Sequence, residues 1–210
     1  MNKEVLYDKP RIVLYHNVFT LDECGTINNT IPQEKFFPAQ GFDFKTNTGV
    51  QTDFRSNLTY VDNEFRLVSL QQRLTKLIEE ELVGNSSYEK GCIETPLQIQ
   101  RYAVGQQYKP HIDFFNVAGH SKTFEVDRIA SAIVYLNEDF EGGETFFTTL
   151  SIDVKPKAGS VLFFKYDYND MTVNMNTYHS GMPVTSGVKS IVTAFVRGEA
   201  GSHKWHPIPR

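Results

Sequence analysis

Apolar residues in the first half of the chain recur every three or four positions in two stretches, which is typical of helices with one buried face. The first stretch follows Thr20-Leu-Asp-Glu23, a capping-box pattern that starts a helix, and Pro32 ends it by about residue 30. Asp62 or Asn63 can cap the second helix, and Gly84 is its expected end. Its expected apolar positions are Phe65, Val68, Leu74, Leu77, Ile78 and Leu82.

From residue 97 onward, short runs of β-branched and aromatic residues are separated by Gly, Pro and Asn. Such runs predict many short strands, as in a sandwich or barrel of the jelly-roll kind. The expected strands are 97–104, 108–115, 129–136, 144–149, 161–166 and 190–197. Helices first and strands later favour an α+β layout, in which the helices brace one face of the sheet.

We expect one domain over residues 1–210, with helical support in about 1–96 and a jelly-roll core in about 97–198. Residues 36–49 mix Pro, Gly, Asn and Thr with aromatics and are expected to form an irregular loop. Loops at 36–57 and 114–127 are expected to frame a substrate groove.

Composition narrows the classes of protein to which the chain can belong. A formal net charge of −4, without a dense Lys/Arg run, argues against a nucleic-acid partner. Cys24 and Cys92 are expected to be reduced, because two distant cysteines form neither a disulfide framework nor a C-x-x-C site. The N-terminus is too polar for a signal peptide, and no stretch reaches the ~18–20 apolar residues of a membrane span. We therefore expect a cytoplasmic protein without a membrane partner.

A metal site is predicted from His111, Asp113 and His179. His111 and Asp113 form an H-x-D pair inside the aromatic strand KPHIDFF, and residues two apart on a strand point to the same face. His179 lies far downstream, in YHSGMPV. Two histidines and one carboxylate form the facial triad of non-haem Fe(II) oxygenases, which leaves open positions for a co-substrate and O2. The H-x-D pair alone is weak evidence, because a lone histidine is more often a surface or hydrogen-bonded core residue.

Lys189 follows His179 by ten residues and starts the last predicted strand, KSIVTAFVR. On that strand Lys189, Ile191, Thr193 and Phe195 share one face. A lysine that faces the interior of a barrel needs a buried anion, which a dicarboxylic co-substrate would supply. The alternative is a lysine at the start of an edge strand that points to solvent.

Four segments together resemble the prolyl 4-hydroxylase branch of the Fe(II)/2-oxoglutarate dioxygenases: RYAVGQQYKPHIDFF, YLNEDFEGGETFF, PKAGSVLFF and YHSGMPVTSGVKSIVTAFVR. The resemblance extends over roughly residues 12–198 and is most specific over 97–197. It implies a double-stranded β-helix, which is a cupin-like jelly roll with supporting helices. It also points to the compact forms found in bacteria, algae and viruses.

By matching position, the resemblance makes His111, Asp113 and His179 the catalytic iron ligands. Lys189 would bind the distal carboxylate of 2-oxoglutarate. Tyr102 and Thr145 match positions that hydrogen-bond the same carboxylate in this family. The alternatives are an ordinary core aromatic for the tyrosine and a common strand former for the threonine.

Two further residues are carried over as candidates for substrate binding. Arg55 in TDFRSN matches a basic position associated with substrate handling, although a solvated loop arginine is the alternative. Phe195 stands where relatives often carry Trp, so we expect a changed contour of the pocket. Gly142 and Gly143 are expected to shape the turn before Thr145 and to let the chain approach closely.

The function implied by the resemblance is 4-hydroxylation of prolyl residues in a Pro-containing peptide or protein. The reaction would use Fe(II), 2-oxoglutarate and O2, release succinate, and take ascorbate as a candidate reductant. One alternative is the same chemistry on another amino-acid side chain or on a small molecule. Another is a non-catalytic jelly-roll binding module, in which the three candidate ligands need not converge.

Overall fold

The computed structural model describes residues 2–43, 48–50, 53–82, 92–113, 126–166, 168–169, 172–173 and 175–199. Its elements in chain order are β1 (Asn2–Tyr7), β2 (Ile12–His16), α1 (Leu21–Thr30), η1 (Gln33–Lys35), β3 (Phe37–Pro38), β4 (Gly41–Asp43), β5 (Thr48–Val50), β6 (Leu58–Val61), α2 (Val68–Leu82), β7 (Cys92–Ile93), β8 (Gln98–Tyr102), β9 (Tyr108–His111), β10 (Val126–Tyr135), β11 (Glu141–Gly142), β12 (Thr145–Phe147), β13 (Ile152–Val154), β14 (Val161–Lys165), β15 (Tyr168–Asn169), β16 (Thr172–Val173), η2 (Met175–Thr177), β17 (His179–Gly181), β18 (Val184–Ser186) and β19 (Lys189–Glu199).

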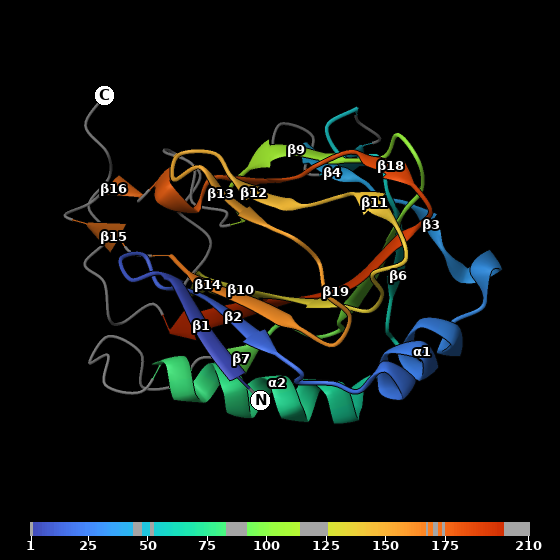
Figure 1. Cartoon of the computed structure of the whole chain (residues 1–210), viewed down its shortest axis with the longest axis horizontal. Coiled ribbons are helices and arrows are strands. Elements are labelled where there is room, and N and C mark those ends of the chain that lie inside the picture. Colours follow the sequence, from blue (N-terminus) through green and yellow to red (C-terminus); the bar gives the residue numbers. More distant parts are fainter. Residues whose placement is uncertain are drawn as a thin grey trace.

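Two antiparallel sheets face one another, and the helices cover the outer face of the larger sheet (Figure 1). The larger sheet has the strand order β1-β2-β14-β10-β19-β8-β6-β3, with β7 paired to β19. The smaller sheet has the order β13-β12-β17-β9. Apart from the pairs β1–β2 and β12–β13, neighbouring strands in these two sheets come from separate parts of the chain, as in a double-stranded β-helix. The predicted α+β jelly roll with bracing helices is therefore confirmed.

Side-chain alternation along β19 separates two cores. Val192, Ala194 and Val196 pack into the core between the larger sheet and the helices. Ile191 belongs to a second core between the two sheets, and Lys189 on the same face is also buried. Because successive residues of a strand point to opposite faces, the odd-numbered residues of β19 face the space between the sheets.

The first predicted helix has the expected boundaries and cap. Thr20 accepts a hydrogen bond from the backbone of Glu23, and the Glu23 carboxylate accepts one from the backbone N–H of Thr20, which completes the capping box. Cys24 on this helix is a free thiol, and burial raises its pKa. The side chain of Cys92 lies outside the described residues. Neither α1 nor α2 has the length and apolar character of a membrane-spanning helix.

The second predicted helix begins later than expected. Asp62 accepts hydrogen bonds from the backbone N–H groups of Arg66 and Leu67, and Phe65 adopts a left-handed backbone with φ of 53°. These residues form a turn, and α2 starts only at Val68. Phe65 is 61% exposed and Val68 is 42% exposed, so the expectation that both lie on the buried face was wrong. Gly84 lies outside the described residues.

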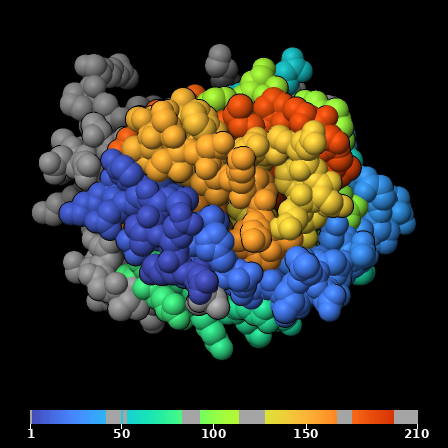
Figure 2. All heavy atoms as spheres, viewed as in Figure 1, coloured from blue at the N-terminus to red at the C-terminus, as the bar shows by residue number. Residues whose placement is uncertain are grey.

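The first 96 residues contribute strands to the main sheet as well as the two helices. Strands β1 and β2 form a hairpin, and β2 pairs with β14 in the larger sheet. Figure 2 shows this hairpin (blue) lying beside segments of the C-terminal half (orange). The expected irregular loop at 36–49 instead contains β3, which pairs with β6, and β4, which pairs with β5. Most of the expected loop at 114–127 lies outside the described residues.

Glu81 joins the N-terminal hairpin to α2. Its side chain is 3% exposed and accepts a hydrogen bond from the Tyr15 hydroxyl. The Glu81 carboxylate also forms ion pairs with Lys3 and with Arg11, whose Nε lies 3.1 Å from Glu81 Oε2. Burial alone would raise the pKa of this carboxyl. The hydrogen bonds from Lys3, Tyr15 and Arg11 outweigh burial, so the pKa of Glu81 lies below its ordinary value.

We expect Glu81→Gln to lower the free energy of unfolding by about 1–3 kcal/mol at pH 7, as for the loss of hydrogen bonds to a charged group. A depressed carboxyl pKa contributes stability above the unfolded-state pKa and loses it as pH falls through the folded-state pKa. The difference in the free energy of unfolding between Glu81→Gln and the wild type should therefore become smaller at acidic pH. Urea unfolding at several pH values measures it, with the exposed Glu80→Gln as the control. An equal loss of stability in both variants would contradict the assignment.

Candidate active site

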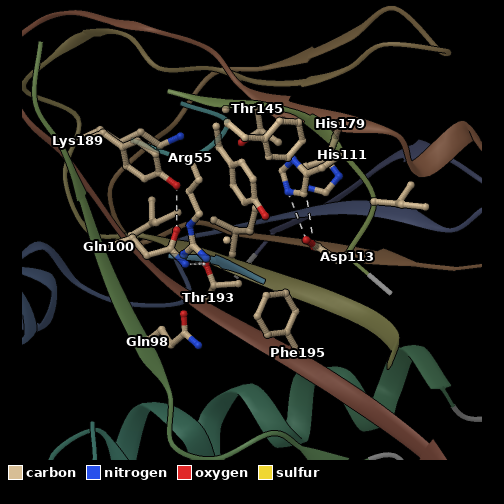
Figure 3. Close-up of a pocket in the computed structure, with 18 of the residues that line it drawn as sticks. Arg55, Gln98, Gln100, His111, Asp113, Thr145, His179, Lys189, Thr193 and Phe195 are labelled. Atoms are coloured by element: carbon tan, nitrogen blue, oxygen red, sulfur yellow. Dashed lines mark hydrogen bonds and ion pairs between the residues drawn. The ribbon is translucent and has the colours of Figure 1, made fainter. Parts of the chain in front are cut away.

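A cavity of about 580 Å³ lies between the two sheets, and residues of β8, β9, β10, β12, β17 and β19 line it. Every site residue predicted from the sequence contributes to its lining (Figure 3). These residues are Arg55, Tyr102, His111, Asp113, Thr145, His179, Lys189 and Phe195.

His111 and His179 come together because β9 and β17 are antiparallel neighbours, with these two residues opposite one another. Asp113 follows two residues after His111, just past the end of β9. His111 Nε2 lies 3.3 Å from Asp113 Oδ1, and His179 Nε2 lies 3.8 Å from Asp113 Oδ2. The three candidate ligand atoms lie within 4.8 Å of one another. The alternative in which these residues do not converge is excluded.

The hydrogen bonds of the two imidazoles suit metal binding. Nδ1 of His111 lies 2.8 Å from the Lys109 carbonyl oxygen, and Nδ1 of His179 lies 2.9 Å from the Thr177 carbonyl oxygen. A carbonyl only accepts, so each Nδ1 carries the proton and each Nε2 keeps a free lone pair. Burial and the neighbouring His111 lower the pKa of His179 to about 4, which keeps this imidazole neutral.

Asp113 supplies a negative charge to the same cluster. Burial alone would raise the pKa of its carboxyl, but His179, His111 and Arg128 hold it well below its ordinary value. Two imidazoles and one carboxylate match the donor set of a non-haem Fe(II) site. The rings of Phe147 and Phe164 pack against His179, at centroid distances of 5.7 and 4.8 Å, and help to keep water from this side.

Three residues that contact Asp113 were missed by the sequence reasoning. Ser131 Oγ donates to Asp113 Oδ2 at 2.7 Å, and the Tyr166 hydroxyl donates to the same oxygen at 3.3 Å. Arg128 donates to the Asp113 carbonyl oxygen at 3.0 Å and is held by two 3.0 Å hydrogen bonds to Glu94. A small polar residue within the apolar run of β10 was the one available signal for Ser131.

Lys189 is buried in another part of the cavity and is 3% exposed. Its Nζ donates to the Gly143 carbonyl oxygen at 2.6 Å and lies 5.4 and 5.7 Å from the ring centroids of Tyr102 and Tyr135. Burial lowers the pKa of the Lys189 ammonium to about 8, partly offset by Glu144. None of the described carboxylates forms an ion pair with it. The alternative of an edge-strand lysine that points to solvent is therefore wrong.

Hydroxyl groups surround the Lys189 end of the cavity. The Tyr135 hydroxyl and Thr145 Oγ1 are 2.8 Å apart, and the Tyr102 hydroxyl donates to Gln100 Oε1 at 2.8 Å. Burial raises the pKa of both tyrosine hydroxyls far above the ordinary value, so both stay protonated. Tyr135 was missed by the sequence reasoning. An ammonium with neutral hydroxyl donors is a suitable environment for a carboxylate.

The two glycines before Thr145 have the expected role. Gly142 and Gly143 adopt φ of 70° and 68°, where side chains are strained. A Cβ at Gly142 would lie 2.4 Å from the Pro183 carbonyl oxygen, and one at Gly143 would lie 3.1 Å from Lys189 Cδ. The close approach lets the Gly143 carbonyl accept the Lys189 hydrogen bond.

Arg55 and Phe195 also border the cavity. Arg55 is half-buried, its Nε donates to Asn57 Oδ1 at 3.0 Å, and its guanidinium lies 5.0 Å from the Tyr108 ring centroid. Figure 3 shows its side chain pointing into the cavity, which excludes a fully solvated loop arginine. Phe195 packs beneath the guanidinium of Arg128, at 3.5 Å from the ring centroid.

Residues 97–197 match the family model of the 2OG-Fe(II) oxygenase superfamily. The chain is 27% identical over 220 residues to prolyl 4-hydroxylase 1 of Arabidopsis thaliana, covering 95% of this chain and 73% of that protein. It is 29% identical over 190 residues to a putative prolyl 4-hydroxylase of Acanthamoeba polyphaga mimivirus, covering 87% of this chain and 75% of the viral protein.

Solved structures show the same fold. The viral collagen prolyl hydroxylase of Paramecium bursaria Chlorella virus-1, in its 2OG complex, aligns with a TM-score of 0.67 and 24% identity over 89% of this chain and 96% of the viral chain. A Trichoplax adhaerens prolyl hydroxylase bound to a hypoxia inducible factor peptide fragment aligns with a TM-score of 0.63 and 16% identity, over 90% of this chain and 84% of that chain. Taken together, residues 97–197 form a domain of the 2OG-Fe(II) oxygenase superfamily, and nearly the whole chain is similar to prolyl 4-hydroxylases.

Proposed function

We propose that this chain hydroxylates prolyl residues at the 4-position in a peptide or protein substrate, with conversion of 2-oxoglutarate to succinate. The observation that carries the proposal is one cavity with two chemically distinct binding groups. A cluster of two histidines and a carboxylate lies in one part of it, and a buried lysine that no described carboxylate pairs with lies in another. A metal ion and a dicarboxylate together would satisfy both.

In this proposal His111 and His179 hold the iron through Nε2, and Asp113 holds it through a carboxylate oxygen. Bound Fe(II) would supply the activation of O2 that drives decarboxylation of 2-oxoglutarate and hydroxylation, a chemistry that side chains alone do not provide. The side chains bind and orient the reactants and exclude water from the site.

Lys189 would pair with the distal carboxylate of 2-oxoglutarate. Thr145 Oγ1, which lines the cavity, would donate to the same carboxylate and accept a hydrogen bond from the buried Tyr135 hydroxyl 2.8 Å away. Tyr102 would close the pocket beside the Lys189 ammonium. Charge-assisted hydrogen bonds of this kind are stronger than neutral ones, especially away from water.

Aromatic rings beside the histidines support a prolyl substrate. The Tyr108 ring stacks on the His111 ring at a centroid distance of 3.5 Å, and Phe54 contacts both rings edge-on. Phe54 is 42% exposed, so this aromatic wall reaches the surface. Proline-rich segments bind aromatic-lined grooves at a low entropic cost, because their extended helix is already formed. Arg55 and Phe195 would contact the substrate from the cavity wall.

The test is incubation with Fe(II), 2-oxoglutarate and O2 and a panel of proline-containing peptides, followed by mass spectrometry of the peptides and measurement of succinate. We expect a gain of one oxygen on a prolyl residue and succinate formation that depends on the peptide. Matched peptides with alanine in place of proline should not stimulate turnover. Peptide-independent turnover, or oxidation of another residue or a small molecule, would instead assign the same chemistry to a different acceptor.

A further inference from the structure

The two carboxylate oxygens of Asp113 have different surroundings. Oδ1 lies 3.3 Å from His111 Nε2 in the candidate metal cluster. Oδ2 accepts hydrogen bonds from Ser131 Oγ at 2.7 Å and from the Tyr166 hydroxyl at 3.3 Å. The two hydroxyls also contact each other. Oδ1 therefore faces His111, whereas Oδ2, which lies 3.8 Å from His179 Nε2, is held by the larger sheet.

Both hydroxyls come from a rigid part of the fold. Ser131 lies on β10 and is fully buried, and Tyr166 directly follows β14 and is 1% exposed. These strands are paired in the larger sheet, and the Tyr166 N–H continues the pairing with a 2.9 Å bond to the Ile129 carbonyl oxygen. The Tyr166 ring packs edge-on against Phe164, with centroids 5.9 Å apart.

Asp113 itself lies past the end of β9, beyond the backbone pairing that orients His111. The Arg128 bond to its carbonyl oxygen restrains the backbone of Asp113, but it leaves the side-chain torsions free. The two hydroxyl contacts to Oδ2 are what orient the carboxylate group. Hydrogen bonds to metal-binding carboxylates commonly fix the ligand in this way.

We propose that Tyr166 and Ser131 are positioning residues, which hold Asp113 through Oδ2 so that Oδ1 is presented to the metal ion. The inference rests on the proposed iron site and extends it. Both hydroxyl contacts go to Oδ2, which leaves Oδ1 turned toward His111 Nε2 in the candidate metal cluster. Without these contacts the carboxylate can rotate, and binding a metal then costs the entropy of fixing it.

The experiment is titration of the metal-free protein with Co(II), monitored by the visible absorption of the bound ion. Tyr166→Phe removes one oxygen and keeps the ring in place. We expect its Co(II) affinity to fall by about 10- to 100-fold, the usual effect of removing a hydrogen bond to a metal ligand. Ser131→Ala should weaken binding comparably, whereas Ser131→Thr, which keeps the hydroxyl, should restore affinity close to that of the wild type.

The matched control is Tyr15→Phe. This change also removes a tyrosine hydroxyl that donates to a carboxylate, here that of Glu81, but Tyr15 lies in the core beside the helices. It should lower the melting temperature without changing Co(II) affinity. Co(II) affinities of Tyr166→Phe and Ser131→Ala within twofold of the wild type would overturn the proposal. If Tyr166→Phe fails to fold, the comparison of Ser131→Ala with Ser131→Thr tests the proposal. Weaker Co(II) binding in Ser131→Ala that Ser131→Thr does not restore would also overturn the proposal.

The Co(II) experiment tests the positioning role separately from the proposed prolyl hydroxylation. If Asp113→Asn abolishes Co(II) binding and the hydroxyl variants weaken it, the positioning role stands even when no prolyl substrate is found. If Co(II) binding is unaffected by Asp113→Asn, the ion binds elsewhere and the positioning role is overturned.

Discussion

Asp113→Asn is expected to abolish both iron binding and turnover of 2-oxoglutarate. The amide has nearly the same shape as the carboxylate, so the two histidines and the fold around them should be retained. What is lost is the one negative charge among the three candidate ligands. Changes to residues that only contact metal ligands already cost about 10- to 100-fold. Loss of the charged ligand should therefore reduce activity by more than about 100-fold.

Two measurements check this expectation. Iron bound per chain after anaerobic loading should fall to background, and succinate formation should become undetectable. Asp22→Asn is the matched control, because Asp22 is exposed on α1 and is not among the residues that line the cavity. Retention of stoichiometric iron and normal succinate formation by Asp113→Asn would remove Asp113 from the site.

Lys189→Ala is expected to raise the KM for 2-oxoglutarate by at least roughly 30-fold, with iron binding retained. Truncating one partner of a buried charge pair costs about 2–5 kcal/mol, since the other charge is left without its partner. Lys189 does not belong to the histidine–aspartate cluster, so the metal should still bind. Steady-state kinetics and iron analysis on the same preparations measure both effects. Lys155→Ala, an exposed lysine on the protein surface, is the control.

Lys189 should also make the KM for 2-oxoglutarate depend on pH. Burial lowers the pKa of Lys189 to about 8, and only the protonated form, which predominates below that value, can pair with a carboxylate. As pH rises through about 8, the affinity of the free enzyme for 2-oxoglutarate should fall, and KM should rise. Bound 2-oxoglutarate favours the ammonium form, so kcat should change less than kcat/KM over this range. Lys189→Arg stays charged and should lose this dependence; an unchanged profile in Lys189→Arg would contradict the role of Lys189.

Local patterns predicted the elements that carry the site. The capping box at Thr20 and Glu23 started α1 as expected, because both of its hydrogen bonds form between residues three apart. Alternation along β19 correctly put Lys189 and Phe195 on one face. Such features depend on a residue and its near neighbours, so the sequence carries them directly.

Prediction failed where other contacts outweigh the apolar pattern, once in a local turn at Asp62 and once through strand pairing at β3. Phe65 continues the apolar spacing of α2, yet the hydrogen bonds of Asp62 form a turn there and leave the ring exposed. The segment at 36–49 lacks a strand pattern, yet β3 is stabilised by pairing with β6. In both places contacts with other groups outweigh intrinsic preference.

The sequence by itself determined the chemical inventory of the site: an H-x-D pair, a later histidine and a lysine ten residues beyond it. Only the tertiary structure decided that these groups meet, because the pairing of His111 with His179 depends on the register of β9 against β17. It also decided that Tyr135, Ser131 and Tyr166 belong to the site. Their hydroxyls have no motif along the chain, and their partners lie 10 to 53 residues away in sequence, within reach only once the two sheets have packed face to face.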